Sequence, residues 1–102
     1  MAIPQGGTPT HYYEIPFSAS KLKDVEITYA QNDEVKVVKT IEDCTIQENE
    51  IITELTQEET FLFDKNYLVQ IQLRLLDDND KVHPSEIMTK SVKKCLSKEV
   101  LE

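Results

Sequence analysis

The chain has 102 residues and a formal net charge of −8, and hydrophobic residues make up 39% of it. This length fits one domain, which can sustain a single hydrophobic core without disulfides or a structural metal. The acidic balance would repel phosphate backbones and anionic lipid, so we expect neither nucleic acid nor membrane binding. No apolar stretch of the sequence approaches the ~20 residues that a membrane-spanning helix needs.

The N-terminal segment, residues 1–8, contains both glycines of the chain, Gly6 and Gly7, together with Pro4. It has no basic start followed by an apolar run, so we expect no signal peptide. Glycine and proline disfavour regular structure, and the segment is therefore predicted to be a flexible N-terminal arm. Residues 9–102 are predicted to form the single folded domain.

Alternating apolar residues predict β-strands through the first half of the chain. The first strand covers about residues 11–17. Because proline cannot donate to a ladder, Pro9 and Pro16 predict that this strand lies at a sheet edge or is kinked at Pro16. Two further strands, joined by polar turn residues into a hairpin, are predicted at residues 23–30 and 34–41.

The middle of the chain carries two more short strands, at about residues 44–46 and 50–55. A helical turn follows, because Thr56 and Glu59 have the spacing of a capping box. Just after this turn, Phe61 and Phe63 are predicted to enter the core.

The longest alternating stretch runs from Tyr67 to Leu75, with five apolar side chains on one face and polar ones on the other. It predicts the central strand of an antiparallel sheet that is buried on one face. The Asp-Asp-Asn-Asp segment at 77–80 predicts a tight turn, which leads into a last strand at about residues 82–94. Pro84 marks the beginning of that strand or an edge position.

About seven short strands, with turn signals roughly every 8 to 12 residues, predict an all-β fold: a single immunoglobulin-like antiparallel β-sandwich. The helical turn before the longest strand is typical of the corner that precedes strand F in such domains. Tyr67 is the candidate for the tyrosine of that corner. A small β-barrel with a similar number of strands is the alternative.

Enzyme signatures are missing from the sequence. There is no Gly-x-Ser-x-Gly elbow, and the only glycines lie near the start, so no phosphate-binding loop is expected. The only histidines, His11 and His83, lack a patterned nucleophile or carboxylate, and with Cys44 and Cys95 they lack the paired spacing of zinc ligands. The turn at 77–80 lacks the glycine of a calcium loop. We expect no enzymatic activity, no cofactor and no metal site.

With enzyme, metal and cofactor functions not expected, the sequence favours a binding or assembly role. Free edges of a sandwich present unpaired backbone groups that can accept a strand from a protein partner. The candidate partner-binding residues are Pro9, Tyr12, Tyr13 and Pro16 in and around the first strand. The prolines have a second interpretation, in which they block edge pairing. The tyrosines beside His11 have a second interpretation as well, as an aromatic platform for a sugar.

Five stretches stand out together: IPQGGTPT at 3–10, ITYAQ at 27–31, LTQEET at 55–60, VQIQLR at 69–74 and CLSKEVL at 95–101. In that order they resemble a family of small, mostly uncharacterised proteins encoded in prophages and tailed phages of Gram-positive bacteria. The family has no assigned catalytic residues, so none is transferred. The resemblance implies a phage-encoded β-domain that is made in the host cytoplasm and either enters the virion or assists its assembly.

These observations together predict a non-enzymatic virion structural or assembly-accessory protein that acts as a protein–protein interaction module in the tail, baseplate or head. Its expected partner is another virion protein or a second copy of the chain. The alternative is a small recognition module that binds a host-surface glycan through Tyr12 and Tyr13.

Overall fold

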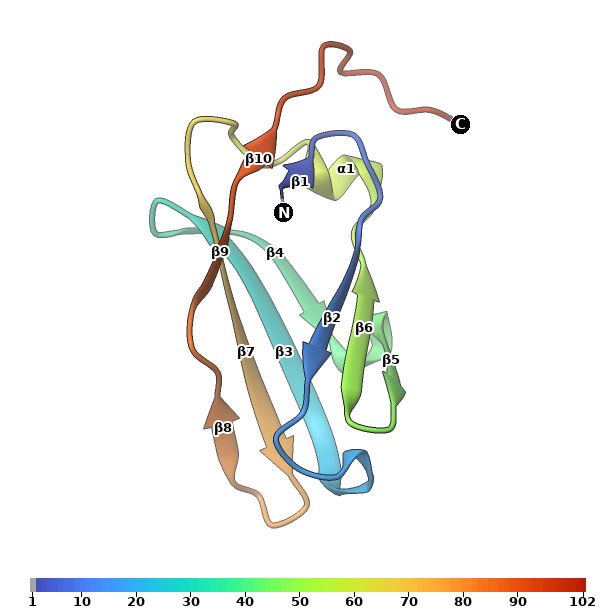
Figure 1. The fold of residues 1–102 in the computed structure, drawn as a ribbon, viewed down its shortest axis with the longest axis vertical. Helices are drawn as coiled ribbons and strands as arrows, with labels where there is room; N and C mark the ends of the chain where they lie inside the picture. The colour runs from blue at the N-terminus through green and yellow to red at the C-terminus, as the bar shows by residue number, and fades with distance from the viewer. Residues whose placement is uncertain (1) are drawn as a thin grey trace.

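A computed structural model describes residues 2–102, and its regular structure consists mainly of β-strands, most of them antiparallel, arranged in two layers (Figure 1). The strands are β1 (Ile3–Pro4), β2 (Thr10–Glu14), β3 (Leu22–Gln31), β4 (Glu34–Thr40), β5 (Cys44–Gln47), β6 (Glu50–Glu54), β7 (Val69–Asp77), β8 (Val82–Pro84), β9 (Met88–Lys90) and β10 (Val92–Lys93). The helical elements are α1 (Gln57–Thr60) and two 3-10 turns, η1 (Ala19–Lys21) and η2 (Ile41–Asp43). The molecule is elongated and measures 46 × 30 × 19 Å.

The strand order is that of an immunoglobulin-like sandwich. One sheet has the order β4-β3-β7-β8, and β9 also pairs with β7. This order corresponds to strands C′, C, F and G of an immunoglobulin-like domain. The other sheet has the order β2-β6-β5, which corresponds to strands B, E and D. β1 pairs in parallel with β10. The predicted fold class is confirmed, and the sheets do not close into the alternative barrel because β2 and β5 each end a sheet.

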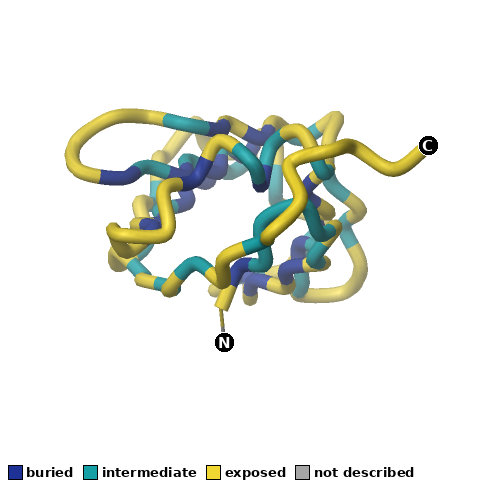
Figure 2. Tube along the Cα trace, turned by 90° about the horizontal axis from the view of Figure 1, so that it is seen from above, coloured by how far each residue is buried: buried dark blue, intermediate teal, exposed yellow. Residues whose placement is uncertain are grey.

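The core lies between the two sheets, where the buried residues of both layers face each other (Figure 2). In β7, the side chains of Val69, Ile71, Leu73 and Leu75 are buried. The alternation of this central strand therefore confirms the predicted inward face. The same two-residue alternation buries Val25, Ile27 and Tyr29 of β3, the neighbouring strand in the same sheet. These residues are the register partners of Leu75, Leu73 and Ile71, respectively.

The central strand begins two residues later than predicted, because Tyr67 and Leu68 lie in the preceding loop. The buried side chain of Gln31 holds this loop: its amide donates to the carbonyl oxygens of Asp64 and Tyr67 at 2.8 and 3.0 Å. The side chain of Tyr67 is 48% exposed, so its prediction as a tyrosine-corner residue is wrong.

The predicted flexible arm is instead part of the fold over the described residues 2–8. Ile3 is 0% exposed and belongs to the core, and it pairs with Val92 across the β1–β10 ladder. The side chain of Gln5 donates to the carbonyl of Phe63 at 2.7 Å. Full burial of an isoleucine contributes about 2 kcal/mol, which offsets the conformational freedom of the neighbouring Gly6 and Gly7.

The predicted last strand is broken into β8, β9 and β10. Pro84 has no amide hydrogen, and beyond it the side-chain hydroxyl of Ser85 accepts the hydrogen bond from the Leu73 amide at 2.9 Å. A side chain thereby replaces a backbone partner in the ladder. The Ser85 amide still donates to the Leu73 carbonyl at 2.8 Å, and regular strand pairing with β7 resumes at β9, where Met88 is the register partner of Ile71.

The capping-box helix is confirmed as α1. The Thr56 hydroxyl accepts from the Glu59 amide at 3.2 Å, and the Glu59 carboxylate accepts from the Thr56 amide at 2.9 Å. After this turn Phe63 is buried as predicted, whereas Phe61 is only half-buried and packs against Gly6.

Candidate functional site

The outer edge of β2 has no strand beside it among the described residues, as predicted for this segment. β2 ends its sheet and pairs only with β6. The carbonyl of Pro9 accepts from the Leu55 amide at 3.1 Å, which shows that the odd-numbered residues direct their backbone groups toward β6. Because these groups alternate along an antiparallel strand, the amides and carbonyls of Thr10, Tyr12 and Glu14 point away from β6.

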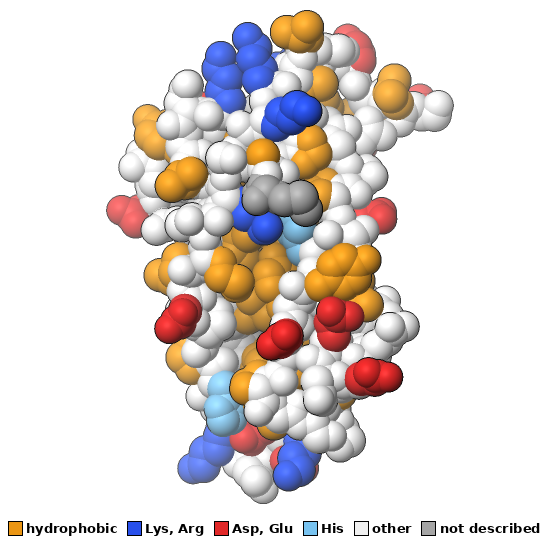
Figure 3. Space-filling view, viewed as in Figure 1, with side chains coloured by type: hydrophobic (Ala, Val, Ile, Leu, Met, Phe, Trp, Pro, Cys, Tyr) orange, Lys and Arg blue, Asp and Glu red, His pale blue; other side chains and the backbone are white. Residues whose placement is uncertain are grey.

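An apolar groove of about 240 Å³ runs beside this free edge, between β2 and the β8 side of the other sheet. Its lining comprises Leu73 and Leu75 of β7, Met88 of β9, Tyr12, Tyr13, Glu14 and Pro16 on the β2 side, and His83, Pro84 and Ser85 on the β8 side. We call it the β2–β8 groove. Figure 3 shows the apolar hollow on this face of the molecule, with acidic side chains around its lower half. The two sheets are left unjoined here, and the core residues Leu73 and Leu75 form part of the groove lining.

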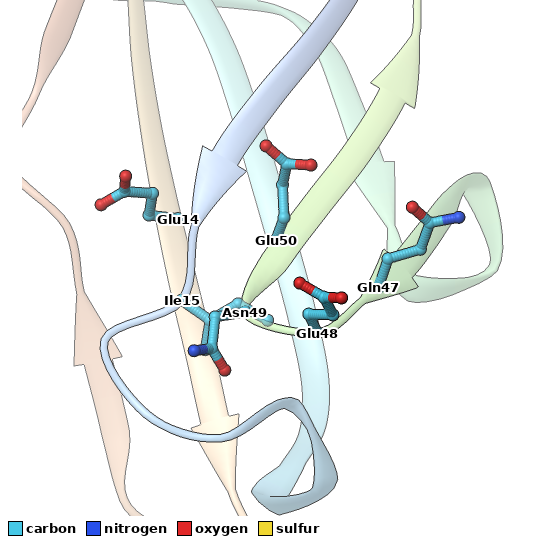
Figure 4. Close-up of a pocket in the computed structure, with 6 residues that line it drawn as sticks. All are labelled: Glu14, Ile15, Gln47, Glu48, Asn49 and Glu50. Carbon is cyan, nitrogen blue, oxygen red and sulfur yellow. The ribbon is translucent and has the colours of Figure 1, made fainter.

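The lower end of β2 is acidic. Glu14 and Glu50 are register partners in adjacent strands, and Glu48 lies in the turn before β6. The three residues gather around an open cavity of about 820 Å³ (Figure 4). Within the described part of the chain, no basic nitrogen lies within 4.0 Å of their carboxylates. Their negative charge is therefore available to a basic partner.

Three of the four predicted site residues line the β2–β8 groove: Tyr12, Tyr13 and Pro16. Pro9 does not, because it precedes β2 at the end opposite Pro16. Both prolines lie just outside β2 and leave the outward amides of Thr10, Tyr12 and Glu14 in place. Neither proline therefore removes a hydrogen-bond donor from the free edge.

The two adjacent tyrosines point in opposite directions and do not form one aromatic platform. The ring of Tyr12 is 61% exposed, whereas Tyr13 is 8% exposed. The hydroxyl of Tyr13 lies 3.0 Å from that of Tyr29, which in turn lies 2.8 Å from Nδ1 of His11. Burial raises the pKa of both tyrosines and, with the charge of Lys90, lowers the pKa of His11 to about 4. This cluster is a neutral structural network in the core.

His83 lines the groove from the β8 side, and its Nε2 lies 2.8 Å from the Asp77 carboxylate. This hydrogen bond, together with backbone amides of the turn, lowers the pKa of Asp77. Asp77 accepts from the amides of Asn79 and Lys81, so the acidic segment is a hairpin turn held by its own side chain.

Neither metal-binding nor membrane-spanning features are found among residues 2–102. No group of three or more histidine, cysteine or acidic side chains is placed to hold a metal ion there. Cys44 and Cys95 are free thiols. The helices of this region are too short and too polar to cross a bilayer.

The residues on the far side of the groove could not be identified from the sequence. Leu73, Leu75 and Pro84 lie about sixty or seventy positions after Tyr12 in the chain, and only the pairing of β8 with β7 brings them to the same groove. Proline in the last strand was the one available signal, since it marks an edge.

Comparison of the chain with models of protein families, with curated proteins and with solved structures finds no match to any of them. The resemblance to phage-encoded proteins therefore stays a prediction from the sequence motifs alone. The site itself combines three features: a free strand edge, an apolar groove beside it and an acidic rim.

Proposed function

We propose that this chain is a non-enzymatic protein–protein interaction module, which accepts an extended segment of a partner along the outer edge of β2. The observation that carries the proposal is the position of the unpaired edge directly beside the β2–β8 groove. The backbone groups of Thr10, Tyr12 and Glu14 would bind the main chain of the partner. An apolar side chain of the added strand would then lie against Leu73 and Leu75.

The sheet edges formed by β4 and β5 are less suited to this role. β4 also ends its sheet, but the side chains of Glu34 and Lys36 place charges along it. Charged side chains on an edge strand oppose pairing with another chain. β5 has only four residues, and the cavity at its Gln47 end is lined by acidic side chains. The edge of β2 therefore combines backbone donors and acceptors with apolar surface in a way that the edges of β4 and β5 do not.

The sequence resemblance supports a specific setting for this module. We propose that it is a structural or assembly-accessory protein of a phage or prophage, made in the host cytoplasm, and that it joins a tail, baseplate or head protein. Mass spectrometry of purified particles from an induced bacterium that encodes the chain tests this setting. A fixed ratio to the major capsid protein indicates a virion component, and absence from particles with abundance in the lysate indicates an assembly factor.

Site-specific photo-cross-linking in the producing cells tests the interaction itself. A photoreactive phenylalanine analogue replaces Tyr12 at the groove, and the matched control replaces Tyr67, which is also exposed but lies in the loop before β7. We expect one defined protein product from position 12 and none from position 67. Equal products from both positions, or none from position 12, would contradict the proposed strand-accepting edge.

The glycan-binding alternative has weaker support, because Tyr12 alone offers an exposed ring in the groove. A sugar stacked on this ring would lose binding in Tyr12→Ala, while backbone pairing along the edge would persist. Binding of the purified chain to isolated cell-wall polysaccharide, compared with that of Tyr12→Ala, distinguishes the two functions.

A further inference from the structure

We propose that the segment accepted by the β2–β8 groove is residues 94–100 of a second copy of the same chain, which follow β10 and which we call the tail. This inference rests on the proposed function, since it names the partner of that site. It predicts a head-to-tail contact in which each copy donates its tail to one neighbour and accepts the tail of another.

The tail has the properties of a donor segment. After β10 the chain has no regular structure, and it runs away from the body of the molecule with exposed residues (Figures 1 and 2). Leu96 is 91% exposed, the highest value of any large apolar side chain described. Such a side chain gains free energy when a groove removes it from water.

Few contacts hold the tail in its present position. The Cys95 amide and the Lys98 ammonium donate to the side chain of Gln5 at 3.1 and 2.9 Å, and the Lys98 ammonium lies 5.8 Å from the centre of the Phe61 ring. The side chain of Gln57 exchanges two hydrogen bonds with the backbone of Leu101. The Cys95 bond is partly buried, whereas the other hydrogen bonds are solvent-exposed, so water replaces those at little cost in free energy when the tail moves.

The charges of the tail and the groove are complementary. Lys93, Lys94 and Lys98 lie in or beside the tail, and no carboxylate of the described residues is within 4.0 Å of their ammonium groups. The unpaired carboxylate of Glu14 lines the groove, and Glu50, its register partner on β6, adds a second negative charge beside it. Opposite charges favour contact between copies, although the net charge of −8 on each copy repels it.

The register of an extended tail fits this contact. In a strand, Leu96 and its even-numbered neighbours Lys94 and Lys98 share one face. With Leu96 in the groove, each lysine lies roughly 7 Å along the strand on either side of it. Lysine side chains are long enough to bring their charges from this face to an acidic rim.

The geometry favours a second copy over the chain's own groove. The tail emerges from β10, which is paired with β1, at the end of the molecule away from the β5–β6 turn (Figure 1). To reach its own groove it would have to reverse direction and pass over β1. A second copy removes this constraint. Because donor and acceptor surfaces differ, the contact repeats and generates a ring or a filament.

Two complementary variants of the full chain test this proposal. The acceptor variant carries Glu14→Lys and Glu50→Lys, and the donor variant carries Lys94→Glu and Leu96→Asp. Glu14, Lys94 and Leu96 are exposed and Glu50 is half-buried, and circular dichroism melting checks that both variants fold. Sedimentation velocity from about 10 to 500 μM measures the association of each chain.

We expect the unmodified chain to associate with increasing concentration, and each variant alone to associate about tenfold more weakly or not at all. An equimolar mixture of the two variants should form a 1:1 dimer, because the intact tail of the acceptor variant meets the intact groove of the donor variant. Adding Tyr12→Pro to the donor variant should abolish this dimer, since it removes an outward-facing amide.

A monomeric unmodified chain at 500 μM, or a mixture that stays monomeric, would overturn the self-association. The proposed function is judged separately, by the cross-link at position 12. A cross-link to a different protein together with a monomeric chain rejects the second copy as partner and retains the strand-accepting groove. No cross-link above the control at position 67 rejects the groove as well.

Discussion

Nδ1 of His11 lies 2.8 Å from the hydroxyl of Tyr29, and this contact joins the two sheets through the core. His11 belongs to β2 and Tyr29 to β3, which are in different sheets. The Tyr29 hydroxyl also lies 3.0 Å from that of Tyr13, so one phenol serves two partners across the sandwich. A buried polar group stabilises a core only while its partners are present.

Tyr29→Phe is therefore expected to destabilise the domain by about 1–3 kcal/mol, because His11 and Tyr13 both lose their buried partner. Urea unfolding at neutral pH measures the difference in free energy. Tyr67→Phe is the matched control, since its ring is half-exposed in a loop, and it should leave stability unchanged. Equal stability of both variants and the parent chain would show that water replaces the missing hydroxyl.

His11 makes stability depend on pH. Burial and the charge of Lys90 lower its pKa from 6.5 to about 4, so the unfolded chain takes up this proton more readily than the folded one. The contribution of His11 is complete above pH 6.5 and is lost as the pH falls toward 4, by up to about 3 kcal/mol. Melting temperatures between pH 7.5 and 4 measure this loss. In His11→Gln, the melting temperature should depend less on pH between 6.5 and 4. An unchanged pH dependence would mean that other groups cause the loss of stability.

Ile71→Asp is expected to unfold the domain. Ile71 is fully buried in the central strand, opposite Tyr29, and an uncompensated carboxylate there costs as much as the ~5–15 kcal/mol that stabilises a small domain. The adjacent Gln70→Asp places the same charge on the exposed face and should remain folded. Far-UV circular dichroism separates the two variants, and a folded Ile71→Asp would mean that the strand presents its other face to the core.

The capping residues of α1 differ in their expected effect. Thr56→Ala removes one capping bond and should cost about 1 kcal/mol. Glu59→Ala also removes the partner of Lys39, whose ammonium lies 2.7 Å from the Glu59 carboxylate and whose side chain is nearly buried. An ammonium left without its partner is more costly, and we expect about 2 kcal/mol or more. Chemical denaturation measures the loss of unfolding free energy in both variants. A larger loss in Thr56→Ala than in Glu59→Ala would contradict this prediction.

Local patterns predicted most of the fold correctly. The alternation in β3 and β7, the polar turn between β3 and β4 and the Thr56–Glu59 box each depend on residues close together in the chain. These local patterns can therefore be recognised in the sequence without knowledge of the tertiary structure. The same holds for the edge position of β2, because Pro9 and Pro16 bracket it wherever the sheet is formed.

The N-terminal segment and the last strand were predicted less well, because distant partners decide them. Ile3 is buried only because Val92 and the core lie beside it, and glycine composition nearby indicated flexibility instead. Ser85 breaks the last strand because its hydroxyl reaches the Leu73 amide. Neither contact is visible in the surrounding sequence.

By itself, the sequence determined an acidic, all-β domain with an edge strand carrying Tyr12, since side-chain alternation and turn chemistry are properties of neighbouring residues. Tertiary structure alone decided that this edge borders a groove. The groove exists because β7 and β8 bring Leu75 and Pro84 to the open side of β2, and pairing between strands so far apart in the chain leaves no local signal.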